Sequence, residues 1–398
     1  MSVTANIPLP YNPAILRWAR ERLGITRSDA AKKANVTEAK VGEWESVDGS
    51  KPTVRQGRIL ADFYDRHYLE FFSKSIPLVP DVKLVPDFRS YSGRGNTDQE
   101  TRLLKAVQEW AESLRENALA LIDEIGERPP VLSTNLRFSV ADDVDVAASV
   151  IREAMDFPIG SQMGLKTSEK HSLPNTIRGK IERMGVLVLK KSGITKLNTR
   201  GMCLFAEPLP VIVYGNEAAS AQAFTLMHEF GHVLLGESGI SGFPRFGRGP
   251  VKGKNAVEDW CNRFAASFLV PAGELAKVID APTSPMATFD PVALSNLATL
   301  FSISRHAMLI RLVNLRYVQP GFYWRTMRPV FLREEAEHQS FGRSRYYGKR
   351  YVNSRGDFYT GLVVEAWGSG KISAHNAAEY MGIKNLEHLK DIREDLRA

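Results

Sequence analysis

Cysteine is nearly absent from this chain of 398 residues, which holds only Cys203 and Cys261. Two cysteines exclude a framework of disulfides, and their scarcity predicts a reducing compartment, the cytoplasm. No apolar run approaches the roughly 20 residues that a membrane helix needs, so we expect no membrane partner. The first residues lack a charged stretch followed by an apolar one, and we therefore expect no signal peptide.

Strong charge is also lacking. Lysine and arginine number 52 against 45 acidic residues, which leaves a formal net charge of only +7. Such a mildly basic balance permits nucleic-acid binding without establishing it. The length exceeds what one ordinary core accommodates, so two or three domains are expected.

The pattern of apolar residues predicts a mainly α protein with a small α+β core and an all-α N-terminal domain. Short helices with tight turns dominate residues 1–72. Prolines and glycines then mark a linker or an extended arm, followed by a long amphipathic helix over 98–128 that ends before a proline pair. We place the domain boundaries as follows: 1–72 helical, 73–135 linker and connecting helix, 136–316 mixed α and β, and 317–398 a small helical domain.

The mixed region contains the segments on which the function depends. VLVLKK after Gly185 and CLFAEPLPVIVYG predict strands, and an apolar helix begins near Ala218. We expect a glycine-rich loop over 237–253, a helix over 255–269 and two further helices over 288–316.

The apolar helix carries HEFGH, a sequence of the form HExxH. Residues four apart on a helix share one face, so His228 and His232 can both bind one zinc ion. Glu229 lies off that line and can act as general base toward a water on the metal. Metal binding explains why titratable groups interrupt an apolar helix, where they would otherwise be costly to bury.

A catalytic zinc site needs a third protein ligand, and Glu258 is the candidate. It lies at the edge of an apolar stripe on the next helix. A solvated glutamate near the start of that helix is the alternative interpretation. Cys261 follows one turn later and is better interpreted as a small buried hydrophobe than as a ligand.

HExxH, followed by the run Glu258, Cys261, Asn262, Phe264, Ala265, Ala266, Leu269 and Pro271, resembles the ImmA/IrrE family of zinc metallo-endopeptidases. PVIVYGNEAASAQAF and PDFRS at 86–90 also resemble segments of that family. The resemblance implies zinc bound by His228, His232 and Glu258, with Glu229 as general base. It further implies that the substrate is a protein, often a repressor. Gln222-Ala223 stands where many members carry a basic pair, which leaves the substrate contacts open.

The N-terminal stretch LGITRSDAAKKANVTEAKVGEWES resembles an Xre-type, lambda-repressor-like helix-turn-helix. This resemblance implies double-stranded DNA as partner, an operator in the promoter of its own operon, and a possible homodimer. The residues that it places in the major groove are Arg27, Glu38, Ala39, Lys40 and Glu43. Two glutamates on that face are unfavourable toward phosphates, so a helix-turn-helix used only for protein contact stays open.

Together these features favour a DNA-binding transcriptional regulator fused to a zinc-dependent endopeptidase that cleaves a regulatory protein. The alternative is an antitoxin or repressor whose peptidase domain senses or docks a partner. A third interpretation, a zinc hydrolase that acts on a non-protein substrate, has little support in the sequence. The basic, tyrosine-rich stretch 342–355 could contact DNA, but a solvated loop or an ordered part of the C-terminal domain is favoured.

Overall fold

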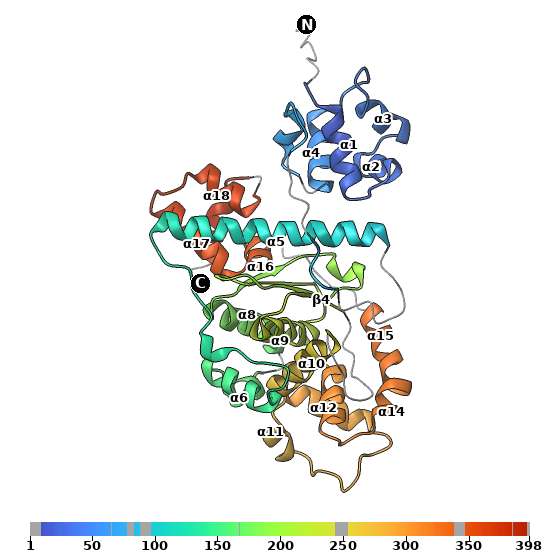
Figure 1. Ribbon diagram of the computed structural model, residues 1–398, viewed down its shortest axis with the longest axis vertical. Helices are drawn as coiled ribbons and strands as arrows, with labels where there is room; N and C mark the ends of the chain where they lie inside the picture. Colours follow the sequence, from blue (N-terminus) through green and yellow to red (C-terminus); the bar gives the residue numbers. More distant parts are fainter. Residues whose placement is uncertain are drawn as a thin grey trace. The chain divides into compact units, whose positions relative to one another are not determined.

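The computed structural model describes residues 9–64, 66–77, 83–87, 97–166, 168–242, 254–337, 347–383 and 385–395 (Figure 1). The chain divides into two compact units. The first comprises Met1–Leu84 and Gly93–Trp110, and the second comprises Val85–Ser92 and Ala111–Ala398. The long helix α5 (Asp98–Ile125) contributes residues to both units. The domain boundaries expected at residues 72, 135 and 316 stay predictions.

The first unit is a group of short helices whose starts are fixed by side-chain caps. The hydroxyls of Thr26, Thr37 and Thr53 each accept a hydrogen bond from a backbone N–H of the first turn that follows. Asn35 adopts a left-handed conformation with φ of 55°, which ends one helix and lets the next begin three residues later. The helices are α1 (Pro13–Arg22), α2 (Arg27–Ala34), α3 (Glu38–Trp44), α4 (Val54–Phe63) and η1 (Tyr68–Phe72).

A buried ion cluster joins these helices. Glu45, which is 4% exposed, accepts hydrogen bonds from Arg20 at 2.5 Å and 3.0 Å. Arg27 Nε also donates to Glu45, at 2.9 Å. Because the cluster bridges α1, the first residue of α2 and the end of α3, it fixes how the two helices on either side of the Asn35 turn lie relative to α1.

The second unit is built around a four-stranded sheet with the order β1-β3-β2-β4. β1 (Leu187–Lys190) pairs parallel with β3 (Val211–Tyr214), whereas β2 (Gly201–Leu204) pairs antiparallel with both β3 and β4 (Gly239–Ser241). Every residue of β2, β3 and β4 is buried. The sheet is therefore covered on both faces, which explains why its strands read as continuous apolar runs.

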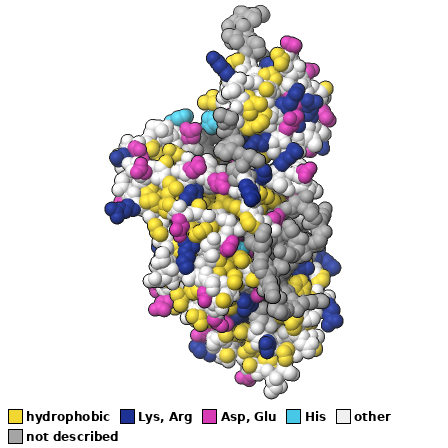
Figure 2. Space-filling model, in the orientation of Figure 1, with side chains coloured by type: hydrophobic (Ala, Val, Ile, Leu, Met, Phe, Trp, Pro, Cys, Tyr) yellow, Lys and Arg dark blue, Asp and Glu magenta, His cyan; other side chains and the backbone are white. Residues whose placement is uncertain are grey.

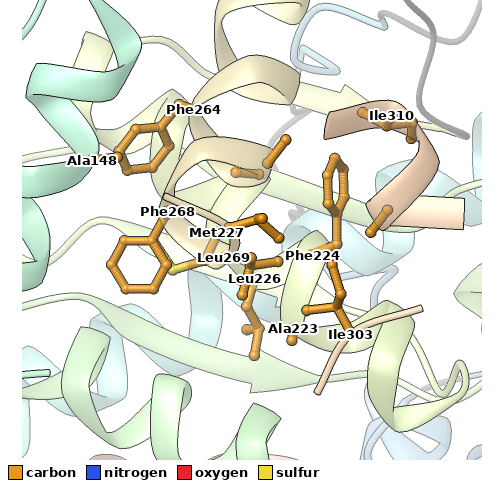
Figure 3. Close-up of a cluster of buried hydrophobic side chains, with 14 of the residues drawn as sticks. Ala148, Ala223, Phe224, Leu226, Met227, Phe264, Phe268, Leu269, Ile303 and Ile310 are labelled. Carbon is orange, nitrogen blue, oxygen red and sulfur yellow. The ribbon is translucent and has the colours of Figure 1, made fainter. Parts of the chain in front are cut away.

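The helices α8 (Leu173–Arg183), α9 (Ala219–Leu235) and α10 (Lys254–Leu269) pack together beneath the sheet (Figure 1). Figure 3 shows the side chains of α9 and α10 in one apolar cluster that includes Phe224, Met227, Phe264, Phe268 and Leu269. α6 (Val144–Ala154) and α13 (Arg305–Asn314) border the same cluster. This burial stabilises the two helices that carry the candidate metal ligands.

Within the second unit, hydrogen bonds join the C-terminal helices to α8. Glu182 accepts a hydrogen bond from the backbone N–H of Phe358, and Arg178 donates to the carbonyl of Asn353. The remaining elements of this unit are η3 (Thr134–Leu136), α7 (Ile159–Met163), η4 (Lys170–Ser172), η5 (Ile194–Leu197), α11 (Ala272–Ala276), α12 (Pro291–Leu300), α14 (Pro320–Phe322), η6 (Tyr323–Met327), α15 (Arg328–Glu337), α16 (Tyr347–Arg355), α17 (Asp357–Gly368), α18 (Ala374–Met381) and α19 (His388–Asp395).

The structure confirms the mainly helical class with a small sheet, and it departs from the sequence prediction at one important place. Residues 239–241, expected in a loop, form strand β4, because their backbone pairs with β2. The outer side of β4 is also paired, since Ile240 N–H donates to the carbonyl of Pro86 at 2.9 Å. In the basic stretch, Tyr347–Arg355 is helical, and residues 342–346 lie outside the described residues.

Candidate metal centre

Helix α9 supplies two of the three candidate ligands. His228 and His232 are one turn apart, and their ring centroids are separated by 5.1 Å. His228 is 5% exposed and His232 is fully buried. The helix ends at Gly236, whose φ of 72° allows its N–H to cap the carbonyls of His232 and Val233. The pair therefore lies in the last two turns of a rigid, buried helix.

Helix α10 supplies the third. Gly231, between the two histidines, faces Cys261, and a Cβ at Gly231 would lie 3.1 Å from Cys261 Sγ and 3.3 Å from its Cα. Only glycine allows this approach without displacing the neighbouring helix. Since Glu258 lies one turn before Cys261, the close crossing brings its carboxylate to the histidines.

The ligand atoms of these residues converge. Glu258 Oε1 lies 3.0 Å from His232 Nε2, and Glu258 Oε2 lies 3.5 Å from His228 Nε2. One ligand atom from each residue lies within 4.8 Å of the others. Two imidazole nitrogens and a carboxylate oxygen are a donor set that zinc favours. The structure thus brings together all three residues that the sequence predicts as metal ligands.

The protonation states fit cation binding. Burial raises the pKa of Glu258, but the charge and hydrogen bonds of the two histidines outweigh it and hold the pKa well below its usual range. Burial lowers the pKa of His232. Burial also acts to lower the pKa of His228, yet Glu258 and Asn262 raise it overall. An ionised carboxylate and a neutral His232 are the forms in which these groups donate lone pairs to a metal.

Glu229 lies beside this group and is fully buried. Neither of its carboxylate oxygens has a hydrogen-bond partner at normal distance among the described residues, and only a weaker interaction with the Ser241 side chain acts to lower its pKa alongside the charge of His228. Burial raises its pKa to about 8, which the charge of His228 only partly offsets. A buried carboxyl without a partner is costly. The buried carboxyl of Glu229 therefore indicates that a cation or a polar reactant binds beside it.

Gly201 on β2 makes room for this carboxyl group. A Cβ at Gly201 would lie 2.6 Å from Glu229 Cγ and 2.5 Å from its Cδ, closer than real side chains approach. The sequence offered no signal for this role, because the contact joins a strand and a helix 28 positions apart.

Ser241 was also missed by the sequence analysis. It is the last residue of β4, it is 1% exposed, and its hydroxyl lies 3.2 Å from His228 Nε2 and 3.4 Å from His232 Nε2. No motif marks it, since it follows the HExxH helix in what reads as a loop.

Neither cysteine belongs to the group of candidate metal ligands that the described residues bring together. Both Cys203 and Cys261 are fully buried, and burial raises the pKa of each thiol well above its usual value. Cys261 packs against Gly231 of α9. The interpretation of Cys261 as a small hydrophobe agrees with this environment.

Gln222-Ala223 stands where many members of the ImmA/IrrE family carry a basic pair. In the structure, a lysine from another element lies beside Gln222. Lys190 Nζ, at the end of β1, donates to Gln222 Oε1 at 3.0 Å. Gln222 in turn donates to the carbonyl of Glu217. Burial is the main cause that lowers the pKa of Lys190 to about 8. A cation from a different element thus lies beside the start of α9.

The residues predicted to contact DNA lie in the first unit, away from these ligands in sequence. Glu38, Ala39 and Glu43 on α3 are exposed, and Lys40 is partly exposed and pairs with Glu43 at 2.8 Å. The Arg27 side chain forms an ion pair with Glu45 at 2.9 Å. Figure 2 shows basic and acidic side chains side by side on this unit rather than a patch of one sign.

Residues 181–313 match the family model of the IrrE N-terminal-like domain, which belongs to the peptidase M78 family. The matched segment contains His228, Glu229, His232 and Glu258, and it supports an enzyme of the metallopeptidase type. Residues 1–180 and 314–398 lie outside the match. The chain matches no curated protein and no solved structure. Among the described residues, no helix is both long and apolar enough to cross a membrane.

Proposed function

We propose that this protein is a cytoplasmic zinc-dependent endopeptidase that cleaves a regulatory protein such as a repressor, and that its N-terminal unit binds DNA. The observation that supports the peptidase best is the convergence of His228, His232 and Glu258 within 4.8 Å, next to the fully buried carboxyl group of Glu229. The match of residues 181–313 to a peptidase family agrees with this proposal.

Three side chains would hold the metal: His228, His232 and Glu258. Zinc, when bound, polarises a peptide carbonyl and lowers the pKa of a coordinated water. The α9–α10 crossing orients the two imidazoles and the carboxylate before any metal arrives, so little reorganisation is needed. The side chain of Glu258 is 19% exposed, and the site is therefore open to solvent on that side.

Glu229 would move the proton. Its carboxylate oxygens would accept a proton from the attacking water and pass it to the amine nitrogen of the leaving peptide. The pKa of Glu229 is raised to about 8 by burial. It falls when positive charge lies beside it, which would return the carboxylate to the ionised form that a base requires.

The proposal is tested by comparing the wild-type protein with Glu229→Gln on a peptide library, with new N-termini identified by mass spectrometry. Wild-type protein with bound zinc should cut, whereas the variant should keep about one zinc per chain and lose cleavage by about 10²-fold or more. Equal cleavage by both proteins would contradict the role of Glu229. If neither protein cuts the library or a co-encoded protein, a sensing or docking role replaces the enzyme.

The DNA-binding part of the proposal is supported by the first unit alone. Two capped helices, α2 and α3, are separated by a tight turn at Asn35, and α3 exposes Glu38, Ala39 and Glu43. In a helix-turn-helix the second of the two helices enters the major groove. We propose an operator in the promoter of its own operon, bound by a dimer whose half-sites are about 34–36 Å apart.

A further inference from the structure

Strand pairing holds the backbone of Ser241 in place, and its side chain also interacts with Glu229. Ser241 pairs with Gly201 of β2, and its carbonyl accepts a hydrogen bond from Arg200 N–H at 3.0 Å. On the outer side of β4, Ile240 N–H donates to Pro86 at 2.9 Å. Because β4 is paired on both sides, the Ser241 side chain has little freedom to leave the site.

The distances from the two imidazole nitrogens to the neighbouring oxygens match the ligand-to-ligand separations of a tetrahedral zinc site. A tetrahedral zinc site with bonds of about 2.0–2.1 Å separates neighbouring ligand atoms by about 3.3–3.4 Å. Ser241 Oγ lies 3.2 Å and 3.4 Å from the Nε2 atoms of His228 and His232. The oxygens of Glu258 lie 3.5 Å and 3.0 Å from the same nitrogens.

From this spacing we propose that Ser241 is a fourth ligand of the metal, whose hydroxyl fills the coordination position that a catalytic zinc keeps for water or substrate. The inference rests on the proposed metal site and adds a fourth ligand to it. Structural zinc sites have four protein ligands, whereas catalytic sites have three and one open position. With Ser241 bound, substrate must displace its hydroxyl from the metal before a carbonyl can bind there, so this ligand slows cleavage by the wild type without abolishing it.

Cobalt substitution and Ser241→Cys test the proposal directly. A thiolate bound to Co²⁺ produces a charge-transfer band in the near ultraviolet, which oxygen and nitrogen ligands do not produce. Co²⁺-loaded Ser241→Cys should show this band, and the wild-type protein should not, because the candidate ligand group consists of His228, His232 and Glu258 and contains neither cysteine. Absence of the band in a cobalt-loaded variant would overturn the assignment of Ser241.

Ser241→Ala tests the proposal a second way, because it should change zinc retention and inhibitor binding in opposite directions. Loss of a ligand should weaken zinc retention against a chelator by about tenfold. The same change should strengthen binding of acetohydroxamate to the Co²⁺ protein by about tenfold, because a coordination position is opened. A merely destabilised site would bind both the metal and the hydroxamate less well, and that result would count against the proposal, as would no change in either.

Ser238→Ala is the matched control. Ser238 lies just before β4, and its hydroxyl accepts a hydrogen bond from Phe205 N–H at 2.8 Å rather than facing the candidate metal ligands. Zinc retention and hydroxamate binding should equal those of the wild type. Wild-type protein that binds neither Zn²⁺ nor Co²⁺ would overturn the proposed peptidase itself, an outcome distinct from a cobalt-loaded protein without the thiolate band.

Discussion

Gly231 of α9 and Cys261 of α10 face each other so closely that a Cβ on the glycine would lie 3.1 Å from the sulfur. This contact sets the separation of the two helices at the candidate site. His228 and His232 flank the glycine on α9, and Glu258 precedes the cysteine on α10 by one turn. The donor set of the metal therefore depends on a residue that binds nothing itself.

We predict that Gly231→Ala separates the helices and weakens metal binding. The added methyl group overpacks a fully buried contact, which costs about 1–3 kcal/mol of stability. Movement of Glu258 away from the histidines should lower zinc retention by about tenfold or more, measured by competition with a chelator.

Gly179→Ala on α8 is the control for this change. Nothing lies within 4 Å of a Cβ at Gly179, and alanine is favoured over glycine inside a helix by about 1 kcal/mol. This variant should be slightly more stable than the wild type and should hold zinc equally well. Unchanged zinc retention in Gly231→Ala would show that the close crossing does not position Glu258.

Gly201→Ala is predicted to separate metal binding from catalysis. Its methyl group would overlap the carboxyl group of Glu229 and displace it, while His228, His232 and Glu258 stay in place. A displacement of about 1 Å can cost about 10²-fold in rate. Zinc content should therefore be normal while cleavage of a peptide that the wild type cuts falls by that factor. Normal cleavage by a folded variant would contradict the predicted position of Glu229.

The stability of the first unit should depend on pH through Glu45. Burial raises the pKa of Glu45, but hydrogen bonds and charge from Arg20 and Arg27 outweigh it and lower the pKa below its ordinary value of 4.5. A carboxyl group with a lowered folded pKa contributes stability above its unfolded value. That contribution is lost as the pH falls below about 4.5 and through the folded pKa.

Urea unfolding of the wild type and of Glu45→Gln over pH 3–7 measures this contribution. Breaking a buried ion pair costs about 3–5 kcal/mol, so the variant should be much less stable at pH 7. The difference between the two proteins should shrink as the pH falls below 4.5. A difference that is constant with pH would show that packing, rather than ionisation, makes Glu45 important.

Lys40→Ala should weaken DNA binding without changing the metal. Lys40 is partly exposed on α3 and pairs only at the surface with Glu43. Loss of one phosphate contact should lower affinity for all sequences and reduce the salt slope by about 1. Arg27→Ala is a less clean test, because Arg27 also stabilises the buried Glu45.

Footprinting of the upstream region of its own gene at several salt concentrations measures this effect, with Lys371→Ala as control. Lys371 is exposed and lies in the turn between α17 and α18. Zinc content should be the same in all three proteins. If the folded wild-type protein gives no protection at low salt, the first unit is a protein-docking module.

The sequence by itself predicts His228, Glu229 and His232 as a metal-binding motif because local spacing encodes it, whereas Glu258 was predicted from its place beside an apolar stripe and from the resemblance. Histidines four residues apart share a helix face whatever surrounds the helix. The helices of the first unit were predictable for the same reason, since caps such as Thr37 and the stop at Asn35 act on the adjacent turn. Zinc, predicted from the HExxH spacing, and the DNA contacts and the substrate, implied by resemblance, stay proposals.

Only the tertiary structure decided the residues that shape the site from other elements. Strand β4 is three residues long and has no pattern of its own, so it exists because β2 and Pro86 supply hydrogen bonds on its two sides. Gly201 matters because a helix side chain fills the space where its Cβ would lie. Ser241 reaches the histidines through sheet register, which places residues distant along the chain beside each other by a geometry that no local sequence pattern records.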